Sequence, residues 1–193
     1  MKTKRKSKPA SRTSARAKSL KGAARKPARR VAAKIARKPQ AIPAGYSSIT
    51  PYLIVNDGAG AIDFYKKAFG AREKMRIGAP EGKIGHAELR FGDSLVMLAD
   101  EYPEYDALSP KSVGGTPVTI HLYVKDVDRT VEQAVGAGAT LVRPVKDQFY
   151  GDRSGCLKDP FGHTWNVATH KEDVSPKEMA RRAEAFMKDP SKH

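Results

Sequence analysis

The sequence has 193 residues, a formal net charge of +15 and a single cysteine. The net positive charge comes from residues 1–44, which hold 16 of the 36 lysines and arginines and none of the 21 acidic residues. The rest of the chain is nearly neutral and long enough for one domain with its own core. One cysteine excludes an internal disulfide, and no run of about 20 apolar residues is present to span a bilayer. We therefore expect a cytoplasmic protein.

Residues 1–45 form a basic tail of Lys, Arg, Ala, Ser and Pro with almost no large apolar side chain. Such a segment buries too little apolar surface to offset the entropy lost on ordering, so we predict disorder. The tail resembles those of linker histones, which implies weak, nonspecific contact with nucleic-acid phosphates. An organelle transit peptide and a solubilising extension without further function are the alternatives. The tail lacks the apolar centre of a secretory signal.

Two segments of the remaining chain read alike and indicate a duplicated domain. Residues 50–71 read TPYLIVNDGAGAIDFYKKAFGA, and residues 119–139 read TIHLYVKDVDRTVEQAVGAGA. Each predicts a strand, then an aspartate, an amphipathic helix and Gly-Ala. The offset of about 69 residues is too long for a solenoid repeat, so it predicts two equivalent halves.

Three further strands are predicted after each helix, so the order strand-helix-strand-strand-strand occurs twice. The two modules span residues 48–105 and 117–172. A final helix is expected within residues 174–193, with Ser175 as N-cap, Pro176 at the first helical position and Glu178 completing a capping box. The strands are expected at residues 71–77, 83–92 and 93–100 in the first module, and at 140–148, 151–159 and 163–170 in the second.

Several motifs occur in an order that resembles the vicinal-oxygen-chelate superfamily, among them HAELRFGDSLVMLADE, DQFYGDRSG and DPFGHTWNVATH. That superfamily includes glyoxalase I, bleomycin-resistance proteins and extradiol dioxygenases, and the sequence is more similar to its PhnB-like, glyoxalase-related branch. The resemblance covers residues 48–185. It implies an α+β fold in residues 46–173, in which the two modules form a cup-shaped, eight-stranded mixed sheet with helices outside.

Alternation along the strands indicates which side chains pack on helices and which line the cup. Val118, Ile120, Leu122 and Val124 are all apolar and are expected to pack. The polar sets on the opposite faces are expected to line the cup, although a plain solvent-facing surface would show the same alternation. The cup-facing side chains are predicted to be Thr50, Tyr52, His86, Glu88, Arg90, Thr119, His121, Tyr123, Asn166 and His170.

The resemblance also supplies a test for a metal site. Members that use a divalent ion hold it with His, Gln or Glu at four equivalent strand positions. These positions fall on Thr50, Thr119, Asn166 and one residue within 96–98, where Val, Met and Leu are all apolar. Hydroxyls and an amide are poor ligands for Zn, Ni or Fe. We therefore expect no metal or other cofactor, although a divalent ion is not excluded.

Two less orthodox sites remain open. His86, Glu88 and His121 form a two-histidine, one-carboxylate set of a kind that binds iron. Without metal, Glu88 or His121 is a candidate general base, with Tyr52 or Tyr123 as proton donor. Hydrogen bonding within the sheet wall is the commoner role for such residues.

Three functions remain open at this point. The first is a homodimer that holds a small aromatic or cationic ligand without chemistry, with Thr50, Tyr52, Thr119, Tyr123 and Asn166 binding it. The second is a lyase, isomerase or epimerase for a small carbonyl substrate, with Glu88, His86 and His121 as catalytic residues. The third is a nucleic-acid-associated protein that acts through its tail.

The stretch at residues 151–170, GDRSGCLKDPFGHTWNVATH, holds the cysteine and two histidines but is predicted to be a strand hairpin. The DPFG segment has the composition of a tight turn. His163 and His170 are an odd number of positions apart, so they point to opposite faces. We expect Cys156 to be structural, because no second thiol accompanies it.

Overall fold

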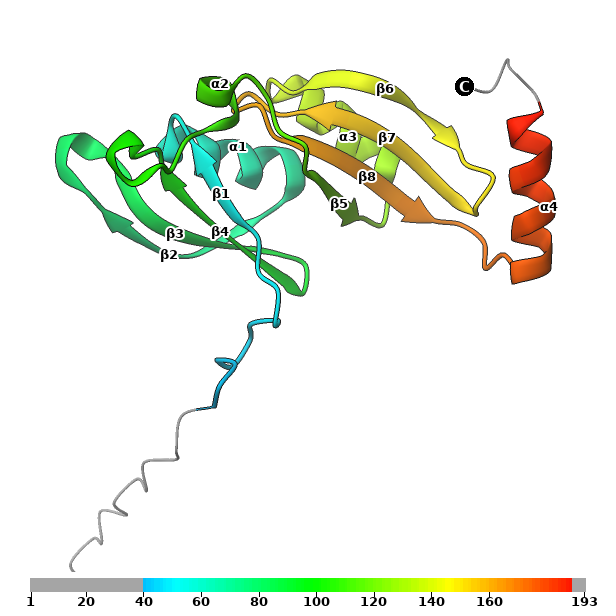
Figure 1. The fold of residues 1–193 in the computed structure, drawn as a ribbon, viewed down its shortest axis with the longest axis horizontal. Helices are drawn as coiled ribbons and strands as arrows, with labels where there is room; N and C mark the ends of the chain where they lie inside the picture. Colours follow the sequence, from blue (N-terminus) through cyan, green and yellow to red (C-terminus); the bar gives the residue numbers. More distant parts are fainter. Residues whose placement is uncertain (1–39, 189–193) are drawn as a thin grey trace, which may run out of the picture. The chain divides into compact units, whose positions relative to one another are not determined.

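A computed structural model describes residues 40–188, and the predicted disorder of the tail lies largely outside this range. The eight predicted strands and three predicted helices are all present (Figure 1). The strands are β1 (Tyr52–Val55), β2 (Arg72–Gly78), β3 (Ile84–Phe91), β4 (Ser94–Asp100), β5 (Thr119–Tyr123), β6 (Thr140–Asp147), β7 (Asp152–Lys158) and β8 (Thr164–His170).

The helices are α1 (Gly58–Phe69), α3 (Val127–Gly136) and α4 (Pro176–Met187), and a short α2 (Pro110–Val113) lies between the modules. Asp57 and Asp126 cap α1 and α3, because each carboxylate accepts a hydrogen bond from the backbone N–H three positions later, that of Gly60 and that of Arg129. The same N-cap aspartate stands between strand and helix in both sequence repeats, as expected for two equivalent modules. Two 3₁₀ turns, Pro80–Gly82 and Pro103–Tyr105, complete the elements.

The strands divide into two four-stranded sheets with the orders β1-β4-β3-β2 and β5-β8-β7-β6. In each sheet the first strand runs parallel to the last strand of its module, and the other neighbours are antiparallel. The α+β fold of two tandem modules is thereby confirmed. The eight strands form two sheets because no strand of one module pairs with a strand of the other.

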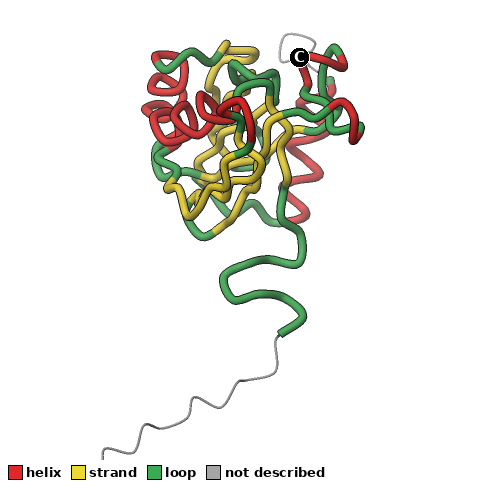
Figure 2. Tube along the Cα trace, turned by 90° about the vertical axis from the view of Figure 1, so that its left-hand side faces the viewer, coloured by secondary structure: helices red, strands yellow, loops and turns green. Residues whose placement is uncertain are grey.

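Both modules share one hydrophobic core. Helix α1 packs on β2, β3 and β4, helix α3 packs on β6, β7 and β8, and the two helices pack on each other. The ring of Trp165 lies 5.4 Å from that of Tyr65, 4.8 Å from that of Phe69 and 5.6 Å from that of Phe91. Aromatic side chains bury large areas, so this cluster ties the second module to the first. Figure 2 distinguishes these helices from the strands and from the loop that leads into β1.

The face predictions hold for most strands. Leu53, Val55, Leu89, Trp165 and Val167 are buried against the helices. The prediction is wrong for Val118, which is 64% exposed. Strand β5 begins one residue later, so this side chain lies outside the paired ladder.

The C-terminal helix begins as predicted, since the hydroxyl of Ser175 accepts a hydrogen bond from the N–H of Glu178 at 3.3 Å. The carboxylate of Glu178 pairs with Arg181 and Arg182 instead of closing the capping box. No residue of α4 is buried. Its contacts include a ring pair between Phe149 and Phe186 at 5.1 Å.

Candidate functional site

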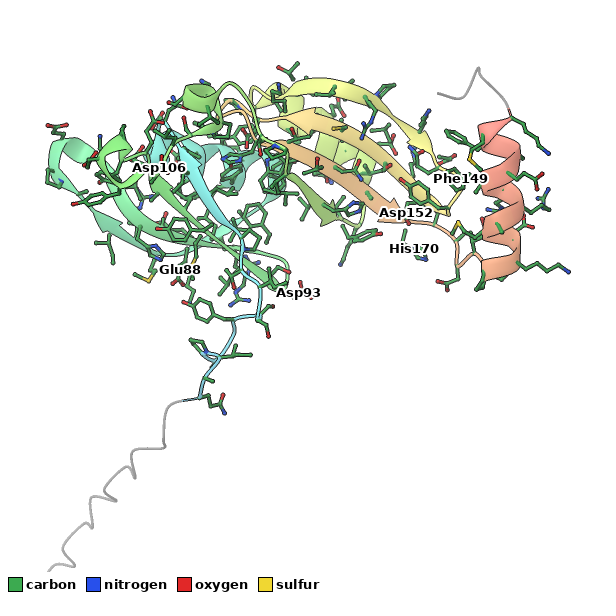
Figure 3. The ribbon with its side chains drawn as sticks, viewed as in Figure 1. Glu88, Asp93, Asp106, Phe149, Asp152 and His170 are labelled. Atoms are coloured by element: carbon green, nitrogen blue, oxygen red, sulfur yellow. The ribbon has the colours of Figure 1, made fainter. Side chains whose placement is uncertain are left out.

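Each sheet has one face covered by helices and one face without helices, which we call its open face. The open face of the first sheet carries Tyr52, His86 and Glu88, and that of the second sheet carries His121 and Asn166, as alternation predicted. Glu88 is visible on the first sheet in Figure 3. These two faces are the candidate site.

The centre of the first open face is an ion pair that sequence analysis did not find. Oε2 of Glu88 lies 2.7 Å from Nζ of Lys74, and Oε1 accepts a hydrogen bond from the hydroxyl of Tyr46 at 2.5 Å. The Lys74 ammonium also donates to the Tyr46 hydroxyl at 2.8 Å and lies 4.1 Å from the centre of its ring. These donors lower the pKa of Glu88, with the Lys74 hydrogen bond as the largest cause. A buried carboxylate with both oxygens occupied is a weak general base.

A second chain of contacts leads from this carboxylate to the surface. The hydroxyl of Tyr52 lies 2.9 Å from Nδ1 of His86, and Nε2 of His86 lies 3.6 Å from Oε1 of Glu88. When the phenol donates to Nδ1, the imidazole proton sits on Nε2 and faces the carboxylate. Burial raises the pKa of Tyr52, so this hydroxyl stays protonated at neutral pH. The arrangement orients a phenol and an imidazole on the open face.

On the second open face, His121 and Asn166 form a hydrogen-bonded pair. Nδ2 of Asn166 lies 3.0 Å from Nδ1 of His121. Because an amide nitrogen can only donate, Nδ1 is the acceptor and the proton of the neutral ring sits on Nε2. His121 therefore presents an N–H donor on this face.

A third cluster lies at the end of β8, where Figure 3 shows Asp152 and His170 beside the connection to α4. Asp152 is buried, and its two oxygens accept from the Tyr123 hydroxyl at 2.9 Å and pair with Nδ1 of His170 at 2.7 Å. Nε2 of His170 lies 3.0 Å from Asp173. Hydrogen bonds to Asp152, then to Asp173, raise the pKa of His170, and that to Asp152 raises the pKa of Tyr123.

The strand register identifies the one residue that sequence analysis left open, within 96–98, among the four positions expected from the resemblance. In the β1–β4 ladder Tyr52 pairs with Met97, and in the β5–β8 ladder His121 pairs with Asn166. Because the two ladders have the same register, Met97 is the first-module equivalent of Asn166. The set is therefore Thr50, Met97, Thr119 and Asn166. The amide of Asn166 is engaged with an imidazole, and the Thr50 hydroxyl donates to a backbone carbonyl at 3.3 Å. Hydroxyls, a thioether and an amide do not fit Zn, Ni or Fe.

The alternative set of His86, Glu88 and His121 is divided between the two sheets, since β3 lies in one and β5 in the other. Within residues 40–188, no group of three or more His, Cys, Asp or Glu side chains is arranged to hold a metal ion. His163 is buried, and its Nε2 lies 3.1 Å from the carbonyl oxygen of Ile54. Cys156 is buried and has no disulfide partner.

Sequence analysis did not identify three residues of these clusters, Lys74, Tyr46 and Asp152. Only Asp152 lies in a strand whose alternation indicates the direction of its side chain. Lys74 sits at an irregularity between Glu73 and Met75 in the β2–β3 ladder, so alternation does not indicate its direction. Tyr46 lies in the loop before β1. Asp152 shares the alternation of the predicted β7 strand, which would have placed it on the face of Cys156.

Residues 46–167 match the sequence profile of the Glyoxalase/Bleomycin resistance protein/Dioxygenase superfamily. An uncharacterized protein of Mycobacterium tuberculosis is 47% identical over 135 residues, which cover 68% of this chain and 79% of the relative. None of the helices within residues 40–188 is long and apolar enough to cross a membrane.

Solved structures agree with this match. The crystal structure of TioX from Micromonospora is 29% identical, has a TM-score of 0.53 and covers 64% of this chain and 98% of that chain. A PhnB protein from Bacillus cereus is 18% identical, with a TM-score of 0.50, and covers 64% of this chain and 99% of that one. The second comparison shows the fold alone.

Proposed function

Because the chain belongs to the Glyoxalase/Bleomycin resistance protein/Dioxygenase superfamily, we propose that it binds a small organic molecule on its open faces without a divalent metal ion. The observation that carries this proposal is the donor set at the four metal positions. Three of these side chains offer a hydroxyl or a thioether, and the fourth, Asn166, already serves His121. The open faces still present oriented donors, which suit binding of a polar molecule.

The hydrogen bonds and the lowered pKa of the Glu88 carboxylate favour binding over general-base catalysis. Its oxygens accept from Lys74 and Tyr46, and its lowered pKa makes it a poor proton acceptor at neutral pH. An isomerase or lyase would need another base, and Nδ1 of His86 is already engaged by the Tyr52 hydroxyl at 2.9 Å. Catalysis by a lyase or isomerase is therefore the second candidate function.

We also propose that the functional unit is a homodimer in the cytoplasm. The first open face exposes apolar surface, with Tyr52 47%, Met75 37% and Ile77 54% exposed. Apolar side chains gathered on one face mark a surface that associates. A second copy would cover this face and turn an open sheet into a cup.

A thermal-shift screen tests the binding proposal. A ligand that binds the native state raises the melting temperature, and the Asn166→Leu and Tyr52→Leu variants should reduce that rise. Tyr105→Leu is the matched control, because Tyr105 is 80% exposed and lies in the 3₁₀ turn at Pro103–Tyr105. A screen of aldehydes, drugs and CoA esters without any stabilisation would contradict the proposal, whereas turnover of an aldehyde without metal would favour the lyase.

A further inference from the structure

The second open face contains a cavity of about 480 Å³ whose lining is positively charged. Arg143 and Lys146 line it, together with His121, Asn166, Tyr150 and Phe186. No Asp or Glu belongs to its lining within residues 40–188. A concave surface with one sign of charge raises the local concentration of ligands of the opposite sign.

The duplication explains why Arg143 lacks the acidic partner that the first module supplies to Lys74. In the first module, Glu88 pairs across the ladder with Met75 and neutralises the neighbouring Lys74. The register makes Cys156 the second-module equivalent of Glu88, and Cys156 lies across the ladder from Arg143. The carboxylate that balances the first face is thus replaced by a thiol in the second.

Arg143 is accordingly left with its full hydrogen-bonding capacity. Its side chain is exposed, and its guanidinium makes no hydrogen bond or ion pair with any residue within 40–188. Asp152 is an acidic group on the same strand face, but its oxygens are taken by Tyr123 and His170. A guanidinium presents paired N–H donors that match the oxygens of a carboxylate or phosphonate.

The remaining lining groups complement such a ligand. Nε2–H of His121 is an additional donor, because the Asn166 amide occupies Nδ1. The hydroxyls of Tyr150 and Ser154 lie 3.4 Å apart and can donate as well. Phe186 supplies an aromatic surface on the side of α4.

We propose that this cavity binds a small organic anion, a carboxylate or phosphonate with an apolar body, and that Arg143 holds the anionic group. This inference rests on the proposed function and specifies its ligand class. It replaces the cationic ligand that the sequence suggested with an anionic one, because charge complementarity decides which ligands bind at a charged surface.

The test is binding of four matched probes to the full-length protein by calorimetry at low salt: benzoate, phenylphosphonate, neutral benzamide and cationic benzylamine. We expect the two anions to bind and the other two not to bind. Arg143→Gln should weaken anion binding about tenfold or more, since it removes a charge-assisted hydrogen bond. Arg143→Lys should retain part of the affinity, because it keeps the charge and loses the bidentate geometry.

Arg129→Gln is the matched control, since Arg129 is an exposed arginine on α3 outside this cavity. Anion binding that depends on Arg129 and not on Arg143 would overturn the proposal, and so would failure of both anions to bind. If benzylamine or benzamide binds and Asn166→Leu weakens it while Arg143→Gln does not, the anion inference fails and the proposed function stands. If no molecule in the broader thermal-shift screen binds either, both fail.

Discussion

The hydroxyl of Tyr65 donates a hydrogen bond of 2.7 Å to Oδ2 of Asp159, joining a helix of the first module to the β7–β8 turn of the second. The same oxygen accepts from Nε1 of Trp165 at 2.9 Å, and Oδ1 accepts from the backbone N–H groups of Phe161 and His163. Burial, then the nearby carboxylate, raises the pKa of Tyr65 well above its ordinary value. One buried carboxylate therefore holds both the turn and the contact between modules.

We expect Tyr65→Phe to lower the free energy of unfolding by about 2 kcal/mol, because it removes a hydrogen bond to a buried charged group. Urea denaturation measures the loss. Tyr105→Phe, at an 80% exposed position, should change the free energy of unfolding by less than about 0.5 kcal/mol. Equal effects of the two substitutions would show that the contact contributes nothing specific.

The imidazole of His170 should titrate above its ordinary pKa of about 6.5, because the carboxylates of Asp152 and Asp173 accept hydrogen bonds from the protonated ring. The NMR titration of its ring protons measures this directly. Asp152→Asn should bring the pKa down more than Asp173→Asn, since the hydrogen bond to Asp152 is the larger cause. The reverse order would mean that Asp152 does not pair with the ring.

The same shift predicts a pH dependence of stability. A histidine whose pKa is raised by folding stabilises the native state fully below its unfolded pKa, and this contribution is lost as the pH rises through the folded pKa. Wild type should therefore lose stability above about pH 6.5 relative to His170→Gln. Parallel stability curves for the two proteins in that range would rule out this contribution.

The purified full-length protein should contain far less than one equivalent of Zn, Ni or Fe, because Thr50, Met97, Thr119 and Asn166 offer no imidazole or carboxylate. Elemental analysis by mass spectrometry measures this content. A chelator should leave the melting temperature unchanged, since no native-state ligand would be withdrawn. A stoichiometric metal retained through purification would contradict the expectation.

Light scattering after size exclusion should give the mass of a dimer. Ile77→Glu should shift the protein toward the monomer, because it places a charge on the apolar part of the first open face. Val135→Glu is the matched control, since Val135 is 43% exposed on α3, away from that face. A monomeric wild type, or equal dissociation by both variants, would refute the dimer proposal.

The basic tail should confer weak DNA binding that falls steeply with salt, because its lysines and arginines release counterions from the phosphates. A protein lacking residues 1–44 should lose this binding, and fluorescence anisotropy with labelled DNA would measure both affinities. The excess of positive charge lies in this segment, and the rest of the chain is nearly neutral. Equal affinity of the two proteins at the same salt concentration would reject a role for the tail.

Local sequence signals were sufficient for the elements of the fold. Alternating apolar residues and turn residues predicted all eight strands, and the Asp-helix-Gly pattern predicted both module helices. Alternation also placed His86, Glu88 and His121 on the open faces, because strand side chains change sides with each residue. Val118 was misplaced since the strand begins after it, a boundary that alternation does not define.

Other features depended on contacts between distant residues. Lys74 reaches Glu88 only because the β2–β3 ladder is irregular there, and Tyr46 reaches it from a loop with no periodicity. The partners of Asp159 lie up to 94 positions away.

The sequence by itself determined that the chain has a basic tail, two equivalent modules and no His or carboxylate at the four positions where the resemblance would place metal ligands, because charge, repetition and residue type are properties of the chain. Only the tertiary structure decided which charges are balanced. Glu88 neutralises Lys74 on one face, whereas Arg143 faces Cys156 on the other. Such pairing depends on strand register, and register is fixed by the packing of both modules on one core.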